Sequence, residues 1–204
     1  DNGLPEIRNH YLSGNVREKL LQAKEAAKTS EKFESNVEAL EAVQPEDLEY
    51  DDISYYLGSA WIPAEVIQDF AQKRMNLTMA VNYMRTDSVN EMATEKWGVR
   101  STSKWSQHNA EFDPGVPRYN AEKILESELN LRTPIVRKNV GTSNDPIMVI
   151  DEKATANVKA AQERMKLAFK EWIDGNEDAQ NKLAASYNEN FNNYVEPKYD
   201  GQHM

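Results

Sequence analysis

The sequence contains no cysteine and no hydrophobic run long enough to cross a membrane. The absence of cysteine excludes disulfides, thiolate zinc ligands and cysteine nucleophiles, and it is typical of proteins from a reducing cytoplasm. A membrane-spanning helix needs about 18 or more consecutive apolar residues, and the chain has no such stretch. We therefore expect a cytoplasmic protein that does not enter a membrane.

The first residues, DNGLPEIRNHYLSG, include no initiator methionine and lack the charged-then-apolar pattern of a signal peptide. We therefore expect the chain to be a fragment of a larger protein. Its 204 residues suffice for one sizeable domain or two small ones. We interpret residues 1–204 as a single domain, with a possible subdivision into an acidic helical part (1–75), a β-containing part (76–150) and a helical hairpin (151–204).

Basic residues are missing from one segment, residues 33–72, although the chain as a whole is only moderately acidic, with a net charge of −10. This segment carries ten acids, which account for the whole excess of negative charge: Glu34, Glu38, Glu41, Glu46, Asp47, Glu49, Asp51, Asp52, Glu65 and Asp69. Such a block repels phosphate, so any contact with nucleic acid is expected elsewhere in the chain. The block itself is a possible partner surface.

Motifs for catalysis and cofactor binding are also missing. There is no G-x-x-x-x-G-K-[ST] loop to hold the phosphates of a nucleotide. The three histidines lie far apart and have no partner at helical spacing, so we expect no metal site. The stretch SNDPIM lacks the second proline and the aromatic residue of an amino-methyltransferase motif. We expect no catalytic residue and no bound cofactor.

Hydrophobic periodicity predicts an α+β fold that is mainly helical, with helices flanking a small antiparallel β region. Helices are expected from a cap at Ser13 or Asn15 to about residue 29, over about 35–43, from Pro63 through Phe70, and over about 119–131, 151–174 and 177–191, with a further short helical turn after Pro45. The last two helices are expected to form a C-terminal helical hairpin. In the first of them, we expect Val158, Ala161, Met165 and Trp172 to be buried.

Two pairs of strands are expected between the helices. Residues 77–85 and 97–105 form the first pair, and the segment between them is too long for a tight turn and is compatible with a helical turn. Residues 133–139 and 145–150 are two short apolar runs that predict a hairpin.

The stretch KWGVRSTSKW places three cations at steps of four. On a strand, Lys96, Arg100 and Lys104 share one face, and Trp97 and Trp105 share the other, because side chains alternate. One interpretation is a strip that contacts a nucleic-acid backbone. The other is a strand with core tryptophans and a solvated basic side.

Arg137 and Lys138, on the later hairpin, form a second candidate strip for nucleic acid. The stretch YYLGSAWIPAEVIQDF, residues 55–70, raises a further question. We interpret it as a fold element in which a turn at Gly58 delivers Trp61 to the core before a helix that starts at Pro63. The alternative is an aromatic shelf that stacks an unpaired base.

Several phrases occur together in one order: YLSGNVREKL, NVEALEAVQPEDL, YYLGSAWIPAEVIQDF, YNAEKILESELNLR, AFKEWI and YNENFNNYVEPKYDGQHM. In this order they resemble the segment between the methyltransferase and helicase parts of the large DNA methyltransferase–helicase fusion proteins of phages, plasmids and conjugative elements. In that family the helicase part is of the Swi/Snf type and lies just downstream. The segment 84–97 departs from the family, in which a short turn joins the two strands.

The resemblance implies a non-catalytic DNA-engaging or coupling domain, whose partners are DNA and the flanking helicase and methyltransferase domains of the parent chain. ATP and S-adenosylmethionine would be cofactors of those other parts, and no catalytic residue carries over to this chain. The alternative is a structural spacer or protein-interaction domain that makes no contact with nucleic acid.

Overall fold

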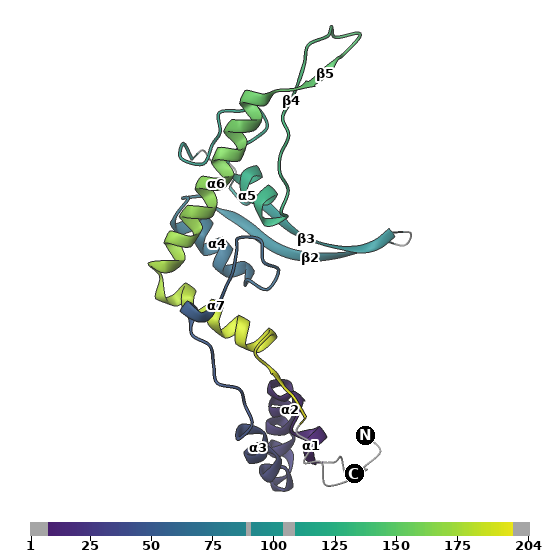
Figure 1. Ribbon diagram of the computed structural model, residues 1–204, viewed down its shortest axis with the longest axis vertical. Coiled ribbons are helices and arrows are strands. Elements are labelled where there is room, and N and C mark those ends of the chain that lie inside the picture. Colours follow the sequence, from purple (N-terminus) through teal and green to yellow (C-terminus); the bar gives the residue numbers. More distant parts are fainter. Residues whose placement is uncertain (1–7, 89–90, 104–108, 198–204) are drawn as a thin grey trace. The chain divides into compact units, whose positions relative to one another are not determined.

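The computed structural model describes residues 8–88, 91–103 and 109–197, which form helices and small antiparallel sheets (Figure 1). This confirms the prediction of a mainly helical α+β fold. The chain divides into two compact units: a first unit of residues 1–53 with 184–204, and a second unit of residues 54–183. This division differs from the boundaries near 75 and 150 that the sequence suggests, because the two ends of the chain join in one unit.

The first unit contains two packed helices and a short sheet. Of the two candidate caps, Ser13 and Asn15, it is Asn15 that caps the first of these helices, by accepting a hydrogen bond from the Glu18 N–H. Val16, Ala23 and Leu40 form the buried core of the first unit. Its elements are α1 (Arg8–Tyr11), β1 (Gly14–Asn15), α2 (Val16–Thr29), η1 (Glu31–Phe33), α3 (Glu34–Glu41), η2 (Tyr50–Asp52) and β6 (Tyr194–Val195).

The two ends of the chain are joined in the first unit by backbone and side-chain contacts. Strands β1 and β6 pair antiparallel, and the buried Asn188 side chain bonds both the N–H and the C=O of Leu48. Residues 44–49 are neither helix nor strand, so the expected helical turn does not begin at Pro45; the short helix there is η2, which begins at Tyr50. A side-chain amide satisfies the Leu48 backbone without a helix.

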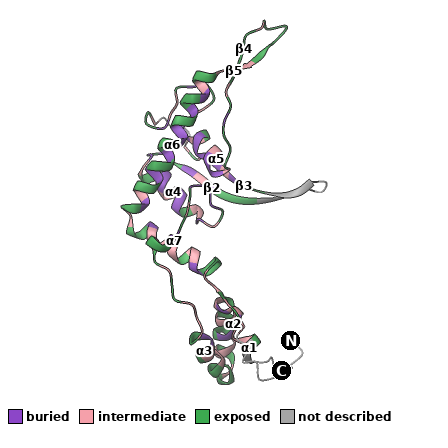
Figure 2. Cartoon of the chain, viewed as in Figure 1, coloured by how far each residue is buried: buried purple, intermediate pink, exposed green. Residues whose placement is uncertain are grey.

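The second unit places two helices against the base of a hairpin and a third helix against one of them. Buried residues concentrate where these elements meet (Figure 2), and the largest fully buried side chains include Phe70, Phe112, Phe169, Leu125 and Met165. Its elements are α4 (Ala64–Lys73), β2 (Met79–Ser88), β3 (Glu91–Ser101), α5 (Ala121–Leu129), β4 (Arg137–Asn139), β5 (Met148–Ile150), α6 (Glu152–Asp174) and the first part of α7 (Glu177–Asn190).

Helix α6 follows the prediction closely at its start and less closely at its end. Asp151 caps it through the Ala154 N–H, and Val158, Ala161 and Met165 are fully buried. Trp172, however, is only half-buried, because Phe169 and Ile173 take the core positions of the last turns. The division between the units falls inside α7, so residues 151–204 are shared between them rather than forming a separate helical hairpin.

The β2–β3 hairpin is longer than the sequence analysis expects. Strand β2 extends to Ser88 and β3 begins at Glu91, so the segment proposed to hold a helical turn is strand over its described residues. The register places the β-branched Thr86 and Thr94 opposite each other, a pairing that favours strand. The expected helical turn is therefore wrong there.

Candidate nucleic-acid interface

The β2–β3 hairpin separates a core face from a solvent face. Trp97 and Val99 are buried on the core face, and Trp97 lies opposite Tyr83, with ring centroids 5.0 Å apart. Lys96 and Arg100, at the alternate positions, are exposed. The prediction that these two cations share a face opposite Trp97 is confirmed, whereas Lys104 and Trp105 lie outside the described residues.

The β2 residues described in register with the two cations are uncharged. In register with Lys96 and Arg100 lie Met84 and Ala80 of β2, with Asn82 opposite Gly98 between them. Neither cation has an acidic partner among the side chains that the structure describes. Two residues separated by four positions on a strand are about 13 Å apart, so the ammonium and guanidinium groups can contact separate phosphates of one DNA strand.

The base of the hairpin is held rigidly by side chains of α5 and its flanks. The Asn130 side chain accepts a hydrogen bond from the Trp97 N–H (2.9 Å) and donates one to the Trp97 C=O (2.9 Å). Glu122 accepts from the Ser101 N–H at 3.1 Å. These side chains bond the backbone groups on the outer edge of β3, where a third strand would otherwise pair. Lys96 and Arg100 therefore project from a fixed backbone.

The stretch 55–70 is part of this same support. Gly58 has a φ of +108°, and a Cβ there would lie 2.8 Å from the Leu129 carbonyl oxygen, so the turn requires glycine. The Gly58 C=O accepts a hydrogen bond from the Trp97 indole N–H at 3.3 Å. Ile62 is buried and Trp61 is only half-buried, so the expectation that Trp61 fills the core is wrong; the turn directs Ile62 inward instead.

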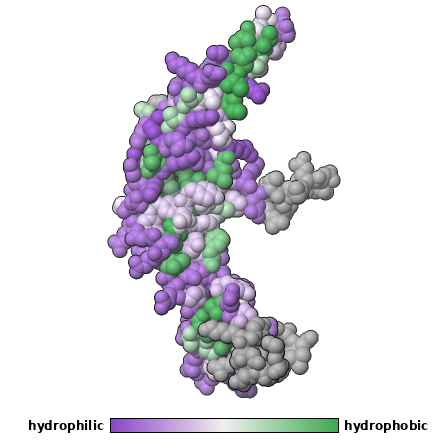
Figure 3. Space-filling model, in the orientation of Figure 1, coloured by the Kyte–Doolittle hydropathy of each residue, from purple (hydrophilic) through white to green (hydrophobic). Residues whose placement is uncertain are grey.

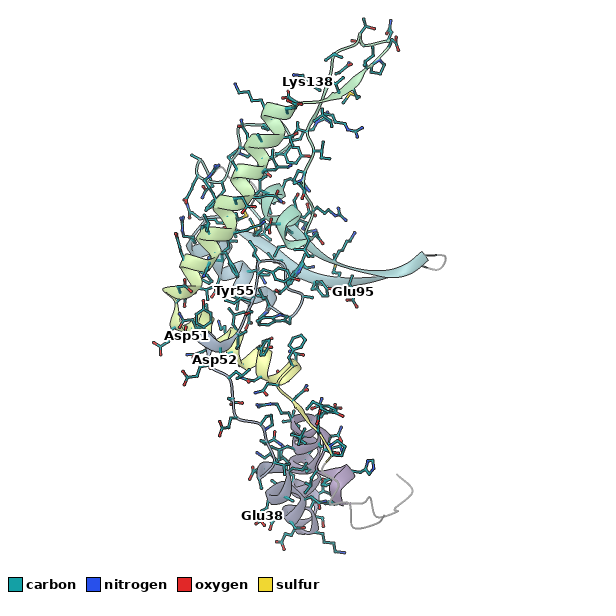
Figure 4. The ribbon with its side chains drawn as sticks, in the orientation of Figure 1. Glu38, Asp51, Asp52, Tyr55, Glu95 and Lys138 are labelled. Carbon is teal, nitrogen blue, oxygen red and sulfur yellow. The ribbon has the colours of Figure 1, made fainter. Side chains whose placement is uncertain are left out.

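Arg137 and Lys138 do not form a single strip. They are consecutive residues of β4, so their side chains lie on opposite faces of the β4–β5 hairpin. Lys138 is paired with Asp151 at 3.4 Å (Figure 4 labels Lys138). The pKa of Asp151 is lowered first by the hydrogen bond from the Ala154 N–H and then by the charge of Lys138.

The acidic block is divided between the two units. Its residues up to Asp52 belong to the first unit, and Glu65 and Asp69 belong to the second. Part of its charge is neutralised locally, since Asp47, Glu41 and Asp69 form ion pairs with Arg17, Lys24 and Lys73. Figure 4 labels Glu38, Asp51 and Asp52 as members of the block.

A buried carboxylate lies between α5 and α6, where the sequence analysis names no residue. Glu128 is only 7% exposed and lies 3.4 Å from the Lys166 ammonium, beside a pocket of about 320 Å³ that Gln162 and Arg132 also line. Burial raises the pKa of Glu128, and Lys166 opposes that shift. Its position was detectable, because Glu128 follows Ile124 by four residues and Leu125 by three and therefore shares their buried face.

The described residues contain no cluster of three or more histidine, aspartate or glutamate side chains arranged to hold a metal ion. Within the same residues, no helix is both long enough and apolar enough to cross a membrane. The described surface offers an exposed cationic strip on one hairpin and an apolar second hairpin.

These features define a mainly helical α+β domain that presents two β-hairpins from a helical base. The chain belongs to the family described as "Domain of unknown function (DUF8437)", whose model matches residues 56–193. The matched range contains both hairpins of the second unit and all of α4, α5, α6 and α7. No curated protein and no solved structure matches the chain.

Proposed function

We propose that this chain is a non-catalytic DNA-engaging or coupling domain of a mobile-element protein that fuses an adenine DNA methyltransferase to a Swi/Snf-type helicase. The observation that carries the proposal is the cationic strip of Lys96 and Arg100 on the solvent face of β2–β3. Lys104 belongs to the same strip in the sequence pattern. The assignment to such a fusion protein is supported by the order of the sequence stretches that resemble this family.

The physical support comes from charge and rigidity together. Cations that form no internal ion pair can neutralise phosphates without first breaking a bond within the protein. Because Trp97 is fixed by Asn130 and Gly58, the strand between the two cations does not have to be ordered on binding. Phosphate contacts of this kind position a protein on DNA without reading its sequence, which fits a coupling domain.

The test is a salt titration of DNA binding with a matched control. The variant Lys96→Glu/Arg100→Glu should lower the slope of log affinity against log salt by about two units, on duplex and on forked DNA. Lys104→Glu, added to it, should lower the slope by about one unit more. The control, Lys153→Glu/Lys170→Glu, makes the same change of charge at exposed positions of α6 and should keep the wild-type slope.

Equal slopes in the two double variants would remove the strip from the proposal, since only overall charge would then matter. Failure of the wild-type chain to bind DNA at low salt would favour the second candidate, a structural spacer or protein-interaction domain. One observation favours that candidate specifically: the β4–β5 hairpin and its flanks expose several large aliphatic side chains, which form a hydrophobic patch (Figure 3). The DUF8437 match is neutral between the two.

The proposal includes no catalysis by this chain and a cytoplasmic location with its flanking domains. ATP and S-adenosylmethionine would be bound by those flanking domains. A purified preparation should therefore turn over neither compound, with or without DNA. Detectable hydrolysis of ATP or transfer of a methyl group by the chain alone would overturn this part of the proposal.

A further inference from the structure

The β4–β5 ribbon, defined here as residues 135–150, exposes an unusual amount of aliphatic surface. Five of its side chains are more than half exposed: Ile135, Val140, Ile147, Met148 and Ile150. Figure 3 shows a hydrophobic patch on this ribbon, with hydrophilic residues at its tip. Single exposed aliphatic residues are normal, but a contiguous apolar patch marks an interaction site. An isolated two-stranded ribbon is also only marginally stable in water.

The apolar side chains cover both faces of the ribbon. The register pairs Arg137 with Ile150 and Asn139 with Met148, so these four side chains share one face. Lys138 and Val149 form the next pair and lie on the other face, together with Val140 and Ile147. Packing against one flat surface would cover only half of this apolar area. A strand added to an edge of the ribbon contacts both faces.

Both edges of the ribbon are open, but they differ in character. The sheet has only two strands, so each has one unpaired edge. The β4 edge carries Arg137 and Lys138, and charged side chains on an edge discourage pairing with another strand. The β5 edge, Met148–Ile150, is entirely apolar and lacks such protection.

The β5 edge also presents backbone groups for pairing. The Val140 N–H donates to the Ile147 C=O and the Asp151 N–H to the Val136 C=O, both at 2.9 Å. These two residue pairs are therefore hydrogen-bonded pairs, and every second pair between them is not. The N–H and C=O groups of Met148 and Ile150 therefore point outward, away from β4. This edge combines unpaired hydrogen-bonding groups with aliphatic side chains.

The ribbon is held in shape without a partner. The Asn139 side chain accepts hydrogen bonds from the N–H groups of Gly141 and Ile147, both at 2.9 Å, and so fixes the turn. At the other end, the Val136 N–H donates to the hydroxyl of the buried Thr155 at 3.0 Å. A strand that adds to this edge meets a template that is already ordered, which lowers the entropy cost of binding.

We propose that the β5 edge binds an extended segment of a partner protein in which apolar and acidic residues alternate. The apolar side chains of that segment would lie with Val149 and Ile147, and the acidic ones would lie on the face of Arg137. Arg137 has no acidic partner among the described side chains, and two strand spacings, about 10 Å, are within the combined reach of an arginine and a glutamate side chain. This inference is independent of DNA binding at Lys96 and Arg100.

The two other occupants fit less well. A second copy of this chain would pair β5 with β5 and would bring no acidic side chain of that strand to Arg137. DNA would meet five exposed aliphatic side chains and two cations, of which Lys138 is already paired with Asp151. A partner segment with alternating apolar and acidic residues places its aliphatic side chains beside Ile147 and Val149. Its acidic side chains would cross Met148 and Ile150 with their methylene groups and place their carboxylates within reach of Arg137.

The test uses the whole 204-residue chain and two labelled peptides, Thr-Val-Glu-Val-Glu-Val-Thr and its counterpart with lysine in place of glutamate. We expect the glutamate peptide to bind about tenfold more tightly in fluorescence anisotropy, and Arg137→Glu to reverse the preference. Methylation of the peptide's backbone nitrogens should abolish binding, since it removes the ladder hydrogen bonds while the protein stays unchanged.

A matched pair of variants tests the edge itself. Met148→Pro removes an outward N–H together with the side chain, and Met148→Thr removes the side chain alone; the first should abolish binding and the second should weaken it several-fold. Equal affinities for the two peptides, or undiminished binding of the methylated peptide, would overturn the proposal. A dimer that Met148→Pro dissociates would overturn the proposal and identify a second copy of this chain as the occupant of the β5 edge. If no peptide binds and Arg137→Glu loses DNA binding, the proposal would be overturned in favour of DNA as the ligand of this ribbon.

Discussion

Replacement of Asn130 by alanine tests how the β2–β3 hairpin is held to the helical base. The Asn130 side chain makes three hydrogen bonds: two with the backbone of Trp97, both at 2.9 Å, and one to the Glu126 C=O at 2.8 Å. Trp97 is only 3% exposed, so water cannot freely replace the lost partners. Each buried backbone group left unpaired costs about 1–3 kcal/mol.

We therefore expect Asn130→Ala to lower the free energy of unfolding of the second unit by about 2–4 kcal/mol, since both a donor and an acceptor lose their partner. Urea unfolding followed by tryptophan fluorescence measures this quantity. All four tryptophans of the chain belong to residues 54–183, so the signal reports on the second unit. Hydrogen exchange of the Trp97 amide provides a local measurement of the same contact.

The control is Asn120→Ala, at the other end of α5. Asn120 makes one capping hydrogen bond, from the Lys123 N–H at 3.0 Å, and its loss should cost about 1 kcal/mol. Equal losses in the two variants would refute the reasoning, because they would mean that Asn130 acts only as the end of a helix. An unchanged exchange rate of the Trp97 amide in Asn130→Ala would refute it as well.

Three further changes should affect the second unit in different ways. Trp172→Ala should cost about 2 kcal/mol in urea unfolding, less than for a fully buried tryptophan, because Phe169 and Ile173 hold the core positions. Gly58→Ala should cost at least about 2 kcal/mol in the same assay, since the turn has a positive φ and no room for a Cβ; a loss of only a few tenths would contradict the observed turn. Burial raises the pKa of Glu128 in the folded state above its unfolded value near 4.5. Below the unfolded pKa the side chain is protonated in both states and its burial does not change stability. Above the folded pKa the buried carboxylate is ionised and destabilises the folded state. Glu128→Gln should therefore stabilise the chain at neutral pH and leave its stability unchanged at about pH 3, as measured by thermal melts across pH; stabilisation at both pH values would contradict the titration.

The local signals in the sequence predict most of the elements correctly. Asn15 and Asp151 begin helices where their side chains can accept a backbone hydrogen bond, and alternation on β3 separates Lys96 from Trp97. These features depend only on residues a few positions apart. Caps and alternation are therefore readable without the fold.

The errors concern contacts between residues far apart in the sequence. Asn188 supports the backbone at Leu48 from 140 positions away, which no pattern near Pro45 reveals. The contact of Asn130 with Trp97 spans 33 positions and identifies the base of the candidate interface. Arg137 and Lys138 are a different case, since alternation alone places them on opposite faces and the sequence analysis did not apply it to them.

The pairing of β1 with β6 has a consequence for the order in which the chain folds during synthesis. Asn15 pairs with Tyr194, so this sheet cannot form until the ribosome has added about 180 further residues. At about 5–20 residues per second, that delay is roughly 10–40 s. The second unit is one continuous stretch, 54–183, and all of it leaves the ribosome before β6. Strand β1 therefore stays unpaired after the N-terminal helices have been synthesised. During this time the second unit, residues 54–183, can complete its own core.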